Sequence, residues 1–284
     1  MPIADTASAR GAPADALRRV AGLEVLTWAV LCGQPVEAFV TTRGGGVSEG
    51  PYASLNMSLS VGDEPGAVLE NRRRVAAAIG ADPADFVFSR QVHGAAVRMV
   101  TATERSSGAF AVDGSVPEAD ALVTADPSVV LAILAADCIP VVLYDPAANV
   151  LGCVHAGWRG TVARACAAAV TAMAGLGARP DTVIAGIGPG IGADRYQVGP
   201  EVAAAAEAGF GPGAGAVIRP DGTGRWLFDL AAANRLVLRE AGIADGNIHA
   251  TSYVTGDGTF FSDRAARPCG RLALVARLRP RGER

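Results

Sequence analysis

The sequence predicts a mixed α/β fold, because short strand-like runs and segments of helical spacing alternate along almost the whole chain. Half of the 284 residues are apolar and 19% are charged, which is sufficient for a substantial core. Neither an internal repeat nor a clear linker divides the chain. One large domain and two tightly fused halves are both compatible with this pattern, after an Ala/Pro/Arg-rich start that we expect to be loosely ordered.

The first part of the chain is expected to hold strands around one long helix. Residues 65–79 have helical spacing, with Val68 and Val75 on the apolar face and residues 72–74, all arginine, exposed. A first strand runs into the glycine-rich segment 43–48, whose backbone can fold closely around a ligand. The strands expected in this part are 36–42, 86–88 and 97–100.

The densest apolar stretch begins at residue 121 and is expected to form buried strands. Residues 129–136 are a continuous apolar run typical of a buried strand, and Asp137 and Cys138 interrupt it. Thr161 is expected to cap an Ala-rich helix that continues to about residue 173. The remaining expected elements are strands at 121–124, 140–144, 150–154, 183–187, 249–254 and 272–278, helices at 200–208 and 230–241, a turn at 145–149 and a glycine-rich loop at 209–224.

The bulk charge and the cysteine pattern exclude several classes of protein. A net charge of −3 gives no electrostatic reason to expect nucleic acid or an anionic membrane surface as a partner. The best candidate for a membrane span, 129–144, is broken by Asp137, and the N-terminal residues lack the pattern of a signal peptide. Five cysteines without C-x-x-C spacing argue against a disulfide framework or a zinc knuckle. We therefore expect a cytoplasmic protein. A monomer or weak homo-oligomer is the expected assembly, although neither charge nor cysteine pattern determines it.

The absence of lysine excludes further chemistry, because all 25 basic residues are arginine. Without a lysine amine, Schiff-base mechanisms such as those of pyridoxal-phosphate enzymes and lysine aldolases are excluded. The phosphate-binding loop of nucleotide-binding proteins that requires a lysine is excluded too. Three histidines are also too few for a four-copper oxidase site built from one chain.

His93, Cys138 and His155 share a local pattern that is compatible with metal binding, since each stands where an apolar strand-like run ends. If the strands at 129–137 and 150–154 pair across the turn, Cys138 and His155 lie near one sheet edge. Two imidazoles and a thiolate form a ligand set for Zn²⁺ with a fourth position open, and copper also accepts these ligands. From these residues alone, a structural thiol and ordinary histidines are the alternative, as for His249.

Two long motifs stand at the centre of the chain: ADCIPVVLYDP (136–146) and VHAGWRGT (154–161). Shorter motifs precede and follow them: TTRGGGVS (41–48), SLNMS (54–58), ENRRRV (70–75), QVHG (91–94), DALVT (120–124), GIGPGIGADRYQVG (186–199), FDL with a following Asn (228–234) and FFS (260–262). In content and order, this series resembles the YfiH, or laccase-domain, family over residues 37–278, and the two long motifs are highly specific to that family.

This resemblance implies a single catalytic domain over residues 23–284 with mixed sheets layered between helices (α/β/β/α), and leaves residues 1–22 as the loosely ordered extension. It also implies that His93, Cys138 and His155 bind one metal ion per chain, normally Zn²⁺, with Cu²⁺ as the alternative. The implied substrates are purine nucleosides and phosphate. Adenosine, inosine and S-methyl-5′-thioadenosine would be split into the base and (methylthio)ribose 1-phosphate, accompanied by adenosine deaminase activity. Departures from the family pattern leave the preferred nucleoside open: Asp194, Arg195, Ala250 and Asp263.

Several polar residues are candidates for binding the substrates of this reaction. Arg43 with the amides of Gly44 and Gly45 is expected to clamp phosphate, an ordinary glycine-rich turn being the alternative. Asn56 is expected to bond ribose or phosphate, or else to stabilise a turn. Arg159, just beyond the second histidine of the metal set, is a further candidate for phosphate.

Asp137 and Cys138 are the expected catalytic residues. Asp137 adjoins the metal ligand and is expected to move a proton to the purine or to hold a ligand in place. A copper-dependent, laccase-like polyphenol oxidase is one rival function, against which the histidine count argues. A metal-free hydrolase with Cys138 as nucleophile and His155 as base is another. A non-catalytic binding module is disfavoured, since a ligand set with an open position indicates chemistry.

Overall fold

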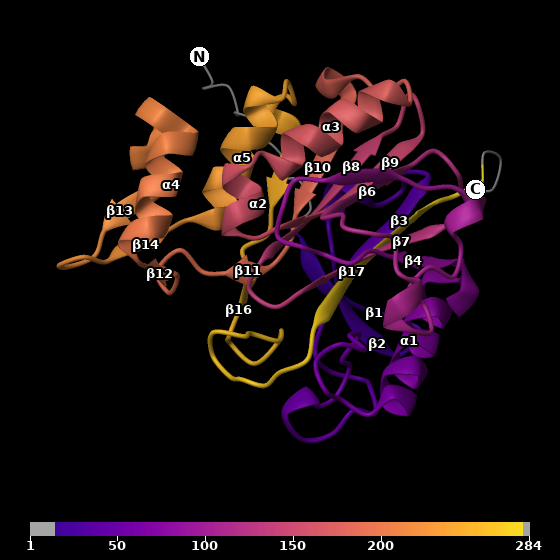
Figure 1. The fold of residues 1–284 in the computed structure, drawn as a ribbon. Coiled ribbons are helices and arrows are strands. Elements are labelled where there is room, and N and C mark those ends of the chain that lie inside the picture. The colour runs from indigo at the N-terminus through magenta and orange to yellow at the C-terminus, as the bar shows by residue number, and fades with distance from the viewer. Residues whose placement is uncertain (1–14, 281–284) are drawn as a thin grey trace, which may run out of the picture.

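The computed structural model describes residues 15–280, and two six-stranded sheets stand at its centre (Figure 1). The first sheet has the order β1 (Ala16–Val20), β2 (Leu23–Thr27), β3 (Val36–Thr41), β17 (Leu272–Leu278), β7 (Val130–Ala135), β4 (Phe86–Phe88). The second has the order β15 (Ile248–Ala250), β10 (Ile184–Ile187), β8 (Ile139–Asp145), β9 (Val150–Ala156), β6 (Ala121–Thr124), β5 (Val97–Met99). Both contain parallel and antiparallel pairs, so the predicted mixed α/β class is confirmed.

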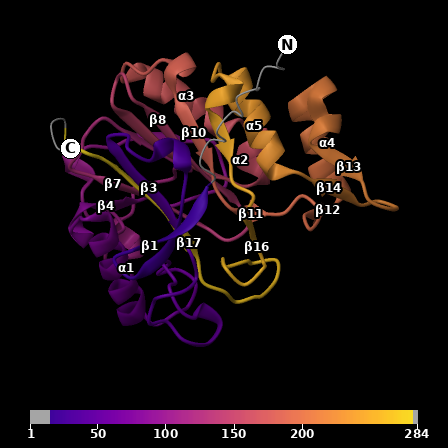
Figure 2. The same ribbon diagram turned by 180° about the vertical axis from the view of Figure 1, so that it is seen from behind.

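The two sheets pack against each other, and helices cover both outer faces (Figures 1 and 2). α1 (Pro65–Ile79) packs on the first sheet, whereas α3 (Ala165–Gly175) and α5 (Leu230–Glu240) pack on the second. In β7, Leu131 faces the layer between the sheets and its neighbour Val130 faces α1. Both faces of this strand are therefore buried, which explains its continuous apolar sequence. The α/β/β/α layering is confirmed.

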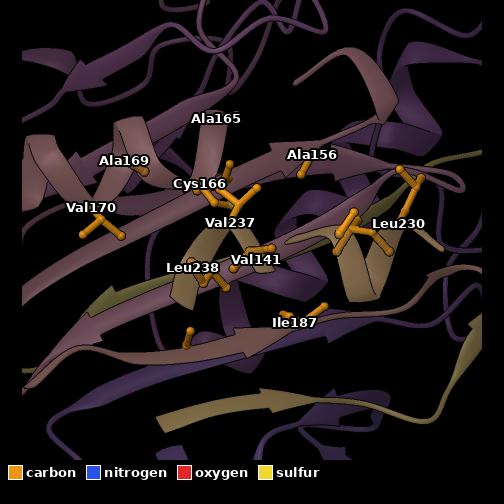
Figure 3. Close-up of a cluster of buried hydrophobic side chains, with 14 of the residues drawn as sticks. Val141, Ala156, Ala165, Cys166, Ala169, Val170, Ile187, Leu230, Val237 and Leu238 are labelled. Atoms are coloured by element: carbon orange, nitrogen blue, oxygen red, sulfur yellow. The ribbon is translucent and has the colours of Figure 1, made fainter. Parts of the chain in front are cut away.

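The small side chains of α3 let this helix lie close to the second sheet. Ala165, Cys166 and Ala169 belong to one buried cluster with Val237 of α5 and Val141 of β8, as Figure 3 shows. Alanine combines high helix propensity with little bulk, so it suits a helix pressed against a sheet. No helix within residues 15–280 is long and apolar enough to cross a membrane.

The helix predicted to begin at Thr161 is wrong in its boundaries, because two helices occupy this segment: α2 (Trp158–Val162) and α3. Arg164 between them has a φ of 65°, in the left-handed region, which separates the two helices. Its side chain stabilises the break by pairing with Glu240 and by donating to the Gly209 carbonyl oxygen at 2.9 Å. The helical periodicity of the sequence does not depend on these long-range contacts, so it could not predict the break between the two helices.

The ordered fold begins before the predicted boundary at residue 23. Residues 1–14 of the predicted extension lie outside the described residues, but Ala16–Val20 forms β1 and pairs with β2. The two strands are joined by Ala21 and Gly22, which both have positive φ, 47° and 87°. Positive φ at both turn residues matches the twist of a two-residue hairpin. Alanine is unusual in the first position of such a turn, so no clear turn signal marks this hairpin in the sequence.

Two small sheets lie beside the main ones. β12 (Gln197–Val198), β14 (Trp226–Phe228) and β13 (Ile218–Pro220) form an antiparallel sheet near α4 (Pro200–Phe210). β11 (Gly190–Ile191) pairs with β16 (Val254–Thr255). The predicted loop at 209–224 therefore contains a strand.

Arg72 is buried, although its position in the arginine run predicted exposure. Its side chain donates to the carbonyl oxygens of Met57, Gly108 and Ala109, at 2.6–3.0 Å. Its guanidinium carbon lies 3.9 Å from the centroid of the Phe88 ring. Burial lowers the pKa of Arg72 to about 10. These contacts join α1 to the loops that contain Met57 and residues 108–109, so Arg72 has a structural role.

Candidate metal centre

His93, Cys138 and His155 come together from three separate segments. One ring nitrogen of each histidine and the Cys138 Sγ all lie within 4.8 Å of one another. The two imidazole rings meet edge to face, with centroids 4.8 Å apart and an interplanar angle of 82°. Within residues 15–280, which include every histidine and cysteine of the chain, this is the one group with the spacing of a metal site.

The β8–β9 hairpin determines where Cys138 lies. The two strands pair antiparallel with Ile139 opposite Ala156. Cys138 directly precedes β8 and Gly157 directly follows β9, so the two residues are neighbours across the hairpin end. The pairing of strands 129–137 and 150–154 considered from the sequence is wrong, because β7 belongs to the first sheet. The interruption of the apolar run at residues 137–138 marks the crossing from one sheet to the other.

A buried carboxylate, Asp120, organises both histidines. Its Oδ1 bonds the Nδ1 of His155 at 2.8 Å and accepts from the backbone N–H of His93 at 2.9 Å. Its Oδ2 accepts from the backbone N–H groups of Val92 and Gly94, at 3.2 and 2.7 Å. Because Nδ1 of His155 is engaged, Nε2 is left to face a metal ion. Sequence reasoning missed Asp120; its signal is an acid directly before the fully buried strand β6.

Two residues of the site have left-handed backbone conformations, with φ of 59° at His93 and 86° at Asp137. Such conformations cost of order 1–3 kcal/mol each and persist only where the surroundings enforce them. At His93 the enforcing group is the Asp120 carboxylate. At Asp137 it is the residue's own carboxylate, which accepts hydrogen bonds from Thr255 Oγ1, Ser262 Oγ and the backbone N–H of Arg264, at 2.5, 2.7 and 2.6 Å.

Charge interactions within the group favour a thiolate at Cys138. Burial opposes ionisation of this thiol, but His155 and His93 outweigh it and lower the pKa of Cys138 to about 6. Burial also opposes protonation of His155, but the negative charges of Cys138 and Asp120 raise the pKa of His155 to about 9. By contrast, burial raises the pKa of Cys166 to about 12. The environment of Cys138 thus differs from that of a core thiol, because it favours the thiolate, the form in which cysteine binds metals.

The packing around the three residues fits a metal ion. A β-carbon on Gly157 would lie 2.7 Å from Cys138 Sγ and 3.2 Å from His93 Cδ2, so only glycine permits this approach. Zinc bonds of about 2.0–2.3 Å can be made by three atoms within 4.8 Å of one another after small rotations. Three protein ligands leave one tetrahedral position open, as in catalytic zinc sites. The donors suit zinc and also accept copper.

A cavity of about 580 Å³ opens beside this group, within the usual size of small-molecule sites. Of the residues predicted from the sequence, Asp137 and Arg159 line it together with the three candidate metal ligands. Tyr196 and Arg264 also line it, and neither was assigned to the site from the sequence. Both stand on loops far from the metal-ligand motifs, so only the fold brings them here. Asp263, a departure from the family pattern, is part of the same wall.

The other predicted substrate-binding residues do not line this cavity: Arg43, Gly44, Gly45 and Asn56. Arg43 donates twice to the Ala53 carbonyl oxygen, at 3.0 and 2.8 Å, and its guanidinium lies 5.1 Å from the centroid of Phe261. Asn56 is fully buried and bonds main-chain groups of Ser58 and the backbone N–H of Arg271. These contacts favour the turn-stabilising interpretation, and phosphate binding by these residues stays a prediction.

Comparison with known proteins places the chain among a set of prokaryotic relatives. A family model described as multi-copper polyphenol oxidoreductase laccase matches residues 37–279. A protein of Deinococcus radiodurans named purine nucleoside phosphorylase is 45% identical over 252 residues, covering 86% of this chain and 89% of that protein. A protein of an unknown prokaryotic organism named adenosine deaminase RL5 is 37% identical over 231 residues, covering 81% and 88%. The crystal structure of YlmD from Geobacillus stearothermophilus aligns with a TM-score of 0.89 at 34% identity, covering 94% and 100%.

Proposed function

The chain belongs to the laccase-domain family described as multi-copper polyphenol oxidoreductase laccase, and on that premise we propose a zinc-dependent purine nucleoside phosphorylase that also deaminates adenosine. Its proposed substrates are adenosine, inosine and S-methyl-5′-thioadenosine, each with phosphate. One zinc ion per chain would be held by His93, Cys138 and His155. The observation that carries the proposal is this open three-ligand group in the wall of a cavity large enough for a nucleoside and phosphate.

The names of the relatives support nucleoside chemistry, and the site supports a single metal ion over several. Relatives with 45% and 37% identity are named for phosphorolysis and deamination of nucleosides. A multi-copper oxidase requires many imidazoles, whereas this chain has three histidines and only two belong to the group. That the protein acts in the cytoplasm, as a monomer or weak homo-oligomer without nucleic acid, stays a prediction.

Phosphorolysis exchanges one bond at the ribose C1′ for another. An oxygen of hydrogen phosphate donates an electron pair to C1′, the bond from C1′ to the purine nitrogen breaks, and that electron pair leaves with the purine. The purine then takes up the proton that the phosphate gives up. A zinc ion bound by the three residues supplies Lewis-acid chemistry and water activation at this end of the cavity. The residues of the chain hold the reactants in line and exclude water, and Asp137 is the proposed proton carrier.

An assay with and without phosphate tests the proposed function. Purified protein incubated with adenosine and phosphate is expected to form adenine and ribose 1-phosphate, together with inosine, ammonia and the hypoxanthine released from inosine. Without phosphate it is expected to form inosine and ammonia only, since deamination consumes water. Chromatography of the bases and nucleosides, with separate assays of ribose 1-phosphate and ammonia, distinguishes the two reactions. Absence of both reactions in protein that carries its metal, with oxidation of phenols in their place, would overturn the proposal in favour of the oxidase.

Asp137→Asn is expected to keep the metal but to lower turnover by about 10²–10⁴-fold, the range for losing a general acid or base. Ser262→Ala is the matched control, because it removes one hydrogen bond to this carboxylate and leaves the carboxylate in place. It is expected to lose far less. Turnover and metal content of both variants are measured together. Near-wild-type turnover in Asp137→Asn, or an equal loss in Ser262→Ala, contradicts a proton-transfer role.

One feature favours a metal-free hydrolase as a second candidate. The Asp120 carboxylate bonds the His155 imidazole, and that imidazole bonds the Cys138 thiol group. A cysteine nucleophile with its base and an orienting carboxylate has the same sequence of contacts. His93 has no role in such a triad, although its ring lies against His155. Alkylation of Cys138 therefore discriminates the two. Protection of this thiol by stoichiometric zinc supports the metal centre, and hydrolytic activity that survives chelation supports the hydrolase.

A further inference from the structure

Six arginines line the cavity, and they differ in whether their charge is already used. Three form ion pairs with carboxylates (Arg90, Arg267 and Arg271), and a fourth, Arg72, is buried with hydrogen bonds to three main-chain carbonyl oxygens. The other two are Arg159 and Arg264. Within residues 15–280, neither forms an ion pair with a carboxylate. The positive charge that the cavity offers to a ligand therefore comes mainly from these two side chains.

Each of the two arginines is braced by an aromatic ring instead of an acid. The guanidinium carbon of Arg159 lies 4.3 Å from the ring centroid of Trp158, its neighbour at the start of α2. That of Arg264 lies 5.3 Å from the centroid of Tyr196, and its Nη1 donates to the Gln197 carbonyl oxygen at 3.0 Å. A ring against the guanidinium restricts its motion while leaving its N–H groups able to donate to a ligand.

Both arginines stand next to residues of the metal end of the cavity. Arg159 lies in the first turn of α2, four residues after His155. The backbone N–H of Arg264 donates to Asp137 Oδ2 at 2.6 Å, and Asp137 directly precedes Cys138. Both arginines line the cavity together with the three candidate metal ligands.

Resting on the proposed phosphorolysis, we propose that Arg159 and Arg264 together bind the phosphate co-substrate beside the metal centre. A guanidinium presents two parallel N–H donors to a phosphate oxygen pair, so two arginines can hold a dianion by up to four charge-assisted bonds. Two carboxylates line the cavity, and both are already engaged. Asp137 accepts three hydrogen bonds, and Asp263 is paired with Arg267 and Arg271.

This assignment differs from the one suggested by the glycine-rich segment. Arg43 does not line the cavity that contains the metal group. Arg159 and Arg264, by contrast, reach the cavity that also contains the metal ligands. A nucleophile must lie within about 3–3.5 Å of C1′, so phosphate and nucleoside need to share one cavity.

The test compares Arg159→Gln and Arg264→Gln with Arg90→Gln and Arg43→Gln, all in metal-loaded protein. The first two variants are expected to raise the KM for phosphate by about 10- to 100-fold, with a small change in the KM for nucleoside. Arg90 lines the same cavity but is paired with Glu118, so Arg90→Gln is the matched control and should change neither. An unchanged phosphate KM in both cavity variants, or a rise confined to Arg43→Gln, overturns the proposal.

Two further readouts separate failure of the phosphate site from failure of the proposed function. Adenosine deamination without phosphate should persist in both arginine variants, which shows that the fold and the metal centre are intact. Calorimetric titration with inorganic phosphate measures binding without any turnover. If the wild-type protein binds phosphate but shows no phosphorolysis, and both arginine variants lose this binding, the anion site is supported and the phosphorylase is refuted. If the wild-type protein shows phosphorolysis and both variants bind phosphate as tightly as it does, only the anion site is refuted.

Discussion

Replacing Cys138 with alanine is expected to reduce bound zinc from about one ion per chain to nearly none and to abolish both nucleoside reactions. The thiolate is one of three proposed zinc ligands, so its loss would leave two imidazoles, too few for a stable zinc site. His93→Ala and His155→Ala are expected to have the same effect. Metal content is measured by elemental analysis of protein purified without added metal, and turnover by the product assay.

His249→Ala is the control for this series, since His249 lies on β15 and is not part of the group. It should keep its metal and its activity. Wild-type protein stripped by a chelator should regain turnover when zinc is returned, and Cys138→Ala should not. Full metal retention in any two of the three ligand variants would be incompatible with the assignment.

The elements that the sequence predicted well are those whose signal is local. The predicted helix at 65–79 and the predicted strands at 86–88 and 272–278 agree with α1, β4 and β17. Each carries its own periodicity or apolar run, and α1 is followed by Gly80, whose φ of 67° suits the residue after a helix end. The elements that were missed depend on distant partners. Arg164 separates α2 from α3 through contacts with Glu240 and Gly209, which no local pattern encodes.

The same distinction holds for the site. His93, Cys138 and His155 were found because thiols and imidazoles are scarce and stand in specific motifs, and the structure brings them together. Arg264 was not assigned, because an arginine in an exposed loop is common and its proximity to the metal centre arises only from folding. The sequence also cannot show which arginines are already paired. The glycine-rich segment at 43–48 was therefore the predicted phosphate site, although its arginine does not line the cavity beside the metal group.

Asp120→Asn is expected to weaken zinc binding by about 10–100-fold, the usual effect of losing a partner that orients a metal ligand. The carboxylate bonds His155 and three successive backbone N–H groups around His93. An amide has one oxygen where the carboxylate has two, so its NH₂ group must face donors. Each buried donor left unpaired costs about 1–3 kcal/mol. Competition with a chelator of known affinity measures zinc binding, and thermal unfolding measures stability.

The loss of stability alone would not show that Asp120 positions the metal, so a matched carboxylate is required. Asp145 is also fully buried and also accepts three backbone N–H groups and one side-chain hydroxyl, but it stands at the opposite end of β8 from Cys138. Asp145→Asn should therefore destabilise the fold by a similar amount and leave zinc affinity unchanged. If both variants lose stability and only Asp120→Asn loses zinc affinity, the Asp120 carboxylate acts on the metal centre through His155 and the backbone of His93. Equal zinc affinities in the two variants would reduce Asp120 to a structural residue.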